Sequence, residues 1–69
     1  MATADVERLV RNLIVERGFP CTLLSVTAAA TGWNVMVRAG TGALVRFAVP
    51  SQRPIAVRET IQEMLEAAL

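Results

Sequence analysis

Residues 33–49 read WNVMVRAGTGALVRFAV, and this stretch decides the fold. Valine, tryptophan and phenylalanine recur at every second position on both sides of the central Gly40-Thr41-Gly42, a pattern typical of two strands with one buried face. Their apolar side chains share that face only if the connecting loop has an odd number of residues. A three-residue loop pairs Ala39 with Ala43, and Gly42 supplies the left-handed conformation that such loops need. The sequence therefore predicts a β-hairpin.

A third strand is expected before this hairpin, because the residues ahead of it are again rich in leucine, valine and threonine. Two alternating sets of side chains can form its buried face: Leu24, Val26 and Ala28, or Leu23, Ser25 and Thr27. Only a loop with an even number of residues places the first set beside the apolar face of the hairpin. Thr31-Gly32 is the predicted loop, since the other register would bury two hydroxyl groups that then need hydrogen-bond partners. On this register the outer face of the sheet carries Leu23, Ser25, Thr27, Asn34, Met36, Arg38, Leu44, Arg46 and Ala48.

A helix is predicted over Asp5–Arg17, where apolar residues recur at the spacings of three and four that mark an amphipathic helix. Thr3 or Asp5 is suited to cap its start. Gly18 is suited to the left-handed position just past its end, and Pro20 prevents continuation. The expected buried stripe consists of Val6, Leu9, Val10, Leu13 and Ile14.

A second helix is predicted from about Pro54, because proline fits the first turn of a helix, where its missing N–H donor is not needed. Its expected buried stripe is Val57, Ile61, Met64, Leu65 and Ala68. Each helix has one apolar stripe and the sheet has one strongly apolar face. The expected architecture is therefore a single α+β domain over residues 1–69, with the order α-β-β-β-α and both helices packed on one face of a three-stranded antiparallel meander.

The chain has 69 residues, of which 54% are hydrophobic and 19% charged, so it is too apolar for a disordered segment. A domain this small is often stabilised by disulfides or a metal site, but this chain has one cysteine and no histidine. Association with another chain then remains as a way to cover exposed apolar surface. The single cysteine, Cys21, does not imply an oxidising compartment. Because Asp5 and Glu7 occur early and no long uncharged apolar run follows, we expect neither a secretory signal nor a membrane span, and a cytoplasmic location is the default.

The reactive side chains argue against catalysis, since the chain has no histidine, tyrosine or lysine. Cys21 lacks a histidine to activate it and is expected to act as a small, partly buried hydrophobe. Glu59, Glu63 and Glu66 align along the second helix, but such a row is usual on a solvated helix face, so we expect no metal site. Trp33 is expected in the core rather than stacked on a ligand. The chain is therefore expected to be non-enzymatic and to need no cofactor.

All seven basic residues are arginine, and the stretch from Gly18 to Arg58 contains no acid, although the net charge of the chain is only +1. Arginine forks match the geometry of phosphate and carboxylate groups. The candidate polyanion-binding residues are Arg38, Arg46, Arg53 and Arg58. Ordinary surface charge is the competing interpretation, with arginine stems covering neighbouring apolar side chains.

In topology, the predicted chain resembles the double-stranded RNA-binding domain, whose first helix and start of the second helix contact the duplex. The resemblance places Arg53 and Arg58 nearest to the lysine cluster with which that family begins its second helix. The Thr31-Gly32 turn is shorter than the Gly-Pro-X-His type loop of that family. The resemblance therefore concerns the order of elements and not the binding motifs.

The leading hypothesis is a small protein-interaction module, a homodimer or a partner of another protein, that associates through the outer sheet face or an exposed strand edge. Semi-apolar patches with arginine at the rim are typical of interfaces. The candidate surface consists of Leu23, Met36, Arg38, Leu44 and Arg46. The alternative is non-sequence-specific binding of nucleic acid or another polyanion through the four arginines, which would weaken steeply with salt.

Overall fold

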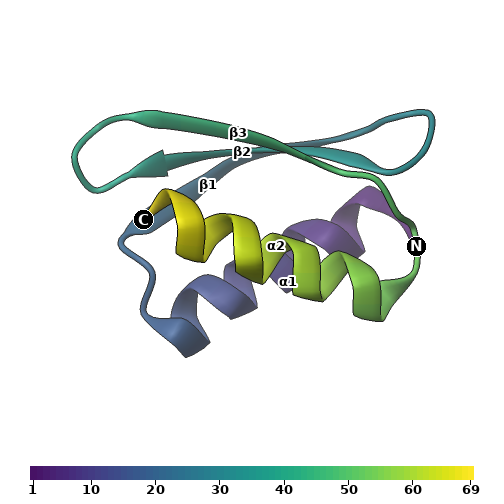
Figure 1. The fold of residues 1–69 in the computed structure, drawn as a ribbon, viewed down its shortest axis with the longest axis horizontal. Helices are drawn as coiled ribbons and strands as arrows, with labels where there is room; N and C mark the ends of the chain where they lie inside the picture. The colour runs from purple at the N-terminus through teal and green to yellow at the C-terminus, as the bar shows by residue number, and fades with distance from the viewer.

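The computed structural model describes residues 1–69 as two layers, a sheet and a pair of helices that both lie on one of its faces (Figure 1). The elements are α1 (Thr3–Arg17), β1 (Cys21–Ala28), β2 (Trp33–Ala39), β3 (Leu44–Val49) and α2 (Pro54–Ala68). The sheet is antiparallel in the order β1-β2-β3, with α1 against β1 and α2 against β3. This arrangement confirms the predicted α+β architecture. No helix has the length and apolar character that a membrane span requires.

The two helices run in the same general direction beneath the sheet (Figure 1). As a result, the N-terminus, the β1–β2 turn and the start of α2 lie at one end of the molecule, on the right of Figure 1. The C-terminus and the β2–β3 turn lie at the other end.

α1 ends as its sequence predicts, but it begins at Thr3 and not at Asp5, and its N-cap is Ala2 and not Thr3 or Asp5. At its start the Asp5 carboxylate accepts a hydrogen bond from the Ala2 N–H (2.8 Å), which satisfies one of the free donors of the first turn. At its end Gly18 is left-handed, with φ of 65°, and the Phe19 N–H donates to the Ile14 carbonyl (3.0 Å). Phe19 and Ile14 are both packed against the core, as is usual for this type of helix ending.

The β2–β3 hairpin confirms the predicted register. The Ala39 N–H donates to the Ala43 carbonyl (2.8 Å) across a three-residue loop, and Gly42 has the expected positive φ of 93°. The apolar residues face one another in pairs on the inner side of the sheet: Trp33 with Val49, Val35 with Phe47, and Val37 with Val45.

The β1–β2 hairpin departs from the predicted register at a bulge. Ser25 lies opposite Met36, but Leu23 lies opposite Val37, so Leu24 is the extra residue between them. The bulge changes the phase of the alternation, and Leu23 therefore packs against the core while Leu24 is 41% exposed. The prediction that Leu24 faces inward and Leu23 outward was wrong, because Leu23 and Val26 both face inward although they are three positions apart, which strict alternation does not allow.

The β1–β2 turn is also displaced from its predicted position. The Ala29 N–H donates to the Gly32 carbonyl (2.9 Å), which leaves Ala30 and Thr31 at the tip instead of Thr31-Gly32. Gly32 is buried, and a Cβ atom at this position would overlap the backbone carbonyl of Val49. Gly32 is thus required for close packing of the hairpin against the end of β3 rather than for the turn itself.

The core lies between the sheet and the helices, but the stripe of α2 is narrower than expected. Val57, Ile61 and Leu65 are fully buried, whereas Met64 is 38% exposed and Ala68 is exposed. Ala68 is the last residue of the helix, and Met64 lies on the flank of α2 that faces away from α1. The buried core consists of Val6, Val10, Leu13, Val26, Trp33, Val35, Val37, Phe47, Val49, Val57, Ile61 and Leu65.

Candidate interaction surfaces

The outer face of the sheet brings together four of the five residues predicted for an interaction surface. Met36 lies opposite Arg46, and Arg38 lies opposite Leu44, so the four side chains occupy two rows of neighbouring strands. Leu44 is 55% exposed, whereas Met36 is half-buried. Leu23 is excluded from this surface, because the bulge turns it toward the core.

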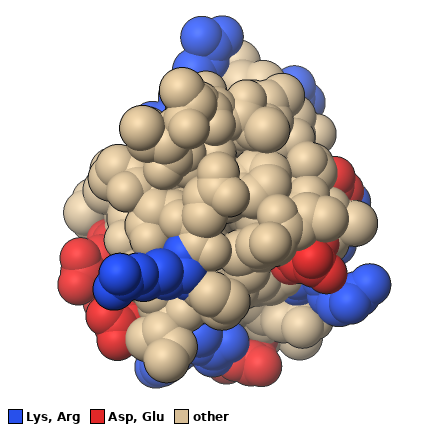
Figure 2. All heavy atoms as spheres, turned by 90° about the vertical axis from the view of Figure 1, so that its right-hand side faces the viewer, with Lys and Arg blue, Asp and Glu red and all other residues tan.

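The outer face is basic and has no acidic side chain. Arg38 and Arg46 are exposed and take part in no ion pair, since the ion pairs of the molecule are Arg11–Glu7 and Arg58–Glu16. The uppermost part of Figure 2, which the sheet forms, accordingly shows blue and tan spheres without red. The electrostatic potential of the two arginines is therefore not neutralised by a neighbouring group.

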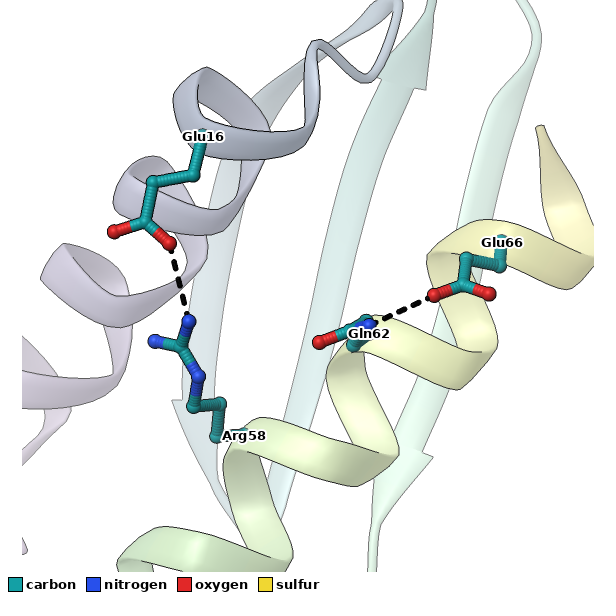
Figure 3. Close-up of polar contacts among 4 residues, drawn as sticks. All are labelled: Glu16, Arg58, Gln62 and Glu66. Carbon is teal, nitrogen blue, oxygen red and sulfur yellow. Dashed lines mark hydrogen bonds and ion pairs between the residues drawn. The ribbon is translucent and has the colours of Figure 1, made fainter.

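The four candidate polyanion-binding arginines do not form one surface. Arg38 and Arg46 lie on the outer sheet face, whereas Arg53 precedes α2. Arg58 lies on the helical side of the molecule, where its Nη2 donates to the Glu16 carboxylate at 3.1 Å (Figure 3). This bond joins α2 to α1, so Arg58 is already engaged within the domain.

A shallow hollow of about 480 Å³ lies on the outer face. Small side chains make it possible, because Ser25, Thr27 and Ala48 rise less from the sheet than Arg46 does. Its lining combines hydrogen-bonding groups with an apolar floor and consists of Ser25, Thr27, Asn34, Val35, Met36, Arg46, Phe47 and Ala48. The predicted outer face included the exposed members of this set, but the hollow itself was not foreseen.

The outer edge of β3 is free of any neighbouring strand, and no bulge interrupts β3. Ala39 and Ala43 form a hydrogen-bonded pair, and such pairs alternate along an antiparallel ladder. Every second residue of β3 therefore directs its backbone N–H and C=O away from β2. These residues are Leu44, Arg46 and Ala48.

The other sheet edge, formed by β1, is irregular. The bulge at Leu24 interrupts the strand near its middle, and Pro20 precedes its first residue. Bulges and prolines at an edge discourage pairing with a further strand. The two edges of the sheet are therefore not equivalent.

One flank of α2 adjoins the β3 edge. Arg58 contacts Glu16 and so marks the flank that faces α1. With 3.6 residues per turn, the opposite flank, beside β3, carries Ala56, Thr60, Met64 and Ala67. We call the combination of this flank and the open edge the β3–α2 side, comprising Leu44, Arg46, Ala48, Ala56, Thr60, Met64 and Ala67.

The remaining chemically distinctive residues are Cys21 and Trp33. Cys21 is half-buried, and this burial raises the pKa of its thiol, which lowers the fraction of reactive thiolate. Trp33 is 4% exposed and belongs to the core, where its Nε1–H has no hydrogen-bond partner. No group of three or more His, Cys, Asp or Glu side chains is arranged to hold a metal ion.

Comparisons with known proteins add no assignment: no family model matches the chain, and no curated protein or solved structure matches it.

Proposed function

We propose that this domain is a non-catalytic protein-interaction module that self-associates by pairing the β3 edges of two copies. The proposal rests on the β3–α2 side, where an open strand edge and an incompletely covered apolar helix flank lie next to each other. Antiparallel pairing about a two-fold axis would join the two sheets into one of about six strands.

Such pairing would also bring the two α2 helices together on the same face of the joined sheet. Met64 is 38% exposed in the single chain, and Ala56 and Thr60 beside it are small, so a second helix could approach closely. Burial of the methionine would add apolar contact to the backbone hydrogen bonds of the edge. Self-association would therefore explain why Met64, which helical spacing predicts in the core, is partly exposed in the single chain.

Edge pairing is favoured over stacking of two outer faces. Each outer face carries Arg38 and Arg46 without an acid, so face-to-face stacking would set like charges against each other. The β1 edge is less suited because of its bulge.

Arg46 limits which register the paired edges adopt. Pairing centred on Arg46 would place this side chain opposite its counterpart, and like charges directly opposite each other are destabilising. A shift by two residues that sets Arg46 opposite Ala48 of the other copy avoids this contact, and both residues still direct their backbone groups to the open edge. We therefore expect weak, reversible association.

Sedimentation equilibrium over a concentration series tests the proposal. Ala48→Pro removes an N–H that points to the open β3 edge and leaves the bonds to β2 intact, so it should abolish dimer formation. Ala28→Pro makes the same change at the β1 edge and is the matched control, which should still associate. A wild-type protein that stays monomeric up to about 1 mM, where even weak binding of about −4 kcal/mol would be seen, contradicts the proposal.

A further inference from the structure

The hollow on the outer face is built from two neighbouring rows of side chains that cross all three strands. Ser25, Met36 and Arg46 form one row. Thr27, Asn34 and Ala48 form the next. Ala48 and the two hydroxyl residues leave the space, and Arg46 stands at its side.

The polar groups around the hollow can all donate hydrogen bonds, and only Arg46 carries a charge. Ser25 and Thr27 contribute hydroxyl groups, Asn34 an amide and Arg46 a guanidinium that is in no ion pair. Met36 is half-buried at the floor and offers an apolar, adaptable contact. A ligand that fits this surface has a carboxylate for the arginine and small apolar groups for the floor.

We infer that the outer sheet face binds an extended acidic segment of a partner protein, with one carboxylate on Arg46 and the segment lying across the hollow. Charge complementarity carries this inference, because the sheet bears two free arginines and no acid. An extended chain suits the shallow, open shape of the hollow better than a compact molecule does.

Nucleic acid fits this face less well. Affinity for a phosphate backbone grows with the number of cations along it, and only Arg38 and Arg46 are available on the outer face. Arg58 is bonded to Glu16 on the helical side. A second copy of the chain is also a poor occupant, since its own outer face repeats the same positive charges.

The test is a heteronuclear NMR titration of the labelled protein with a blocked hexapeptide of alternating glutamate and valine. The same hexapeptide with glutamine in place of glutamate is the control for charge, and a short thymidine oligonucleotide is the control for polyanions. Met64→Glu is used as the background in a second series, because it disturbs the β3–α2 side without touching the hollow. Binding to the outer face is thereby separated from self-association.

We expect saturable amide shifts at Ser25, Thr27, Asn34 and Met36 with the glutamate peptide. Arg46→Gln should raise the dissociation constant of the glutamate peptide about fivefold, which is the loss typical of one partly exposed hydrogen bond between charged groups. Arg8→Gln removes an exposed, unpaired arginine from α1 and should leave the constant unchanged. Thermal unfolding of each variant shows that the fold is retained.

Three results would overturn the inference. The glutamine peptide could shift the same amides with equal affinity, which would remove the role of charge. The oligonucleotide could bind this face more tightly than the acidic peptide, which would assign the surface to nucleic acid. Arg46→Gln could bind as the wild type does, which would place the carboxylate elsewhere.

Discussion

The β2–β3 hairpin runs from Trp33 to Val49 without a break in register, whereas the β1–β2 hairpin shifts register between Leu23 and Ser25. Both hairpins share β2, so the difference comes from their other strand and their loop. In β3 every inward position is apolar and the loop of three residues fits that pattern. In β1 the apolar residues change phase at two consecutive leucines, and one extra residue is accommodated as a bulge.

The same difference separates the two edges of the sheet. The regular alternation of β3 leaves an uninterrupted row of free backbone groups, and the bulge in β1 breaks the corresponding row. Regularity that makes a hairpin easy to predict therefore also makes its outer edge fit for pairing. Our proposed self-association depends on this asymmetry.

The largest expected difference between the two hairpins is in the stability lost when one residue is deleted from the outer strand of each. Deletion of Leu24 removes the bulge and leaves Leu23 facing inward and Ser25 outward, so we expect a free energy of unfolding within about 1 kcal/mol of wild type. Deletion of Arg46 from β3 forces either Val45 or Phe47 out of the core, and we expect no folded protein at 25 °C. Urea unfolding followed by circular dichroism measures both.

A Leu24 deletion that loses all cooperative unfolding would show that the bulge is needed for the fold. In that case the phase change in β1 would have a structural role beyond admitting one extra residue.

Gly32→Ala should have the next largest effect. The added methyl group would overlap the Val49 carbonyl, and backbone cannot move aside as a flexible side chain can. We expect a loss of about 3 kcal/mol or more, which is much of the stability of so small a domain. Gly40→Ala is the matched control, because its Cβ would lie 3.4 Å from the nearest atom, the Pro20 carbonyl oxygen, and we expect a change below about 1 kcal/mol.

Equal effects of the two substitutions in urea unfolding would contradict the close packing of the β1–β2 turn against β3. The contrast is informative because neither glycine has a positive φ, so backbone strain does not differ between them.

Gly42→Ala should cost less than Gly32→Ala. Its φ of 93° is unfavourable for a residue with a side chain, but the space around it is empty. We expect a loss of about 1 kcal/mol, with a smaller loss for Gly42→Asn, because asparagine tolerates the left-handed region. Thermal unfolding of both variants checks the order, and a larger loss for asparagine would argue against conformational strain as the cause.

The sequence was sufficient to predict the element order, the C-terminal end of α1, the start of α2 at Pro54 and the β2–β3 register. These depend on local chemistry, such as the αL glycine after α1 and the alternation around Gly40–Gly42. The bulge at Leu24 could have been suspected from the doubled leucines, but its position depends on pairing with β2. The role of Gly32 was hidden, because it depends on a neighbour seventeen positions away in β3.

The candidate surfaces were predicted in part for a similar reason. Met36, Arg38, Leu44 and Arg46 were placed together by alternation, which is a property of one hairpin. The hollow and the β3–α2 side join residues from several elements, so no single pattern reveals them. Met64 shows this most clearly, since helical spacing assigns it to the core and only the position of α2 beside the sheet edge exposes it.

The smallest expected effect concerns Cys21 at the start of β1. Burial raises the pKa of its thiol in the folded chain above the value in the unfolded chain. The folded state therefore holds this proton at a pH where the unfolded state releases it. The resulting contribution to stability is present below the unfolded pKa and is lost as the pH rises through the folded pKa.

We expect the free energy of unfolding of wild type to fall slightly more than that of Cys21→Ala between neutral and alkaline pH, as measured by urea titrations of both proteins. Equal declines would mean that the thiol is as well solvated in the folded chain as in the unfolded one. That result would contradict the placement of Cys21 on the inner face of the sheet, on the N-terminal side of the bulge.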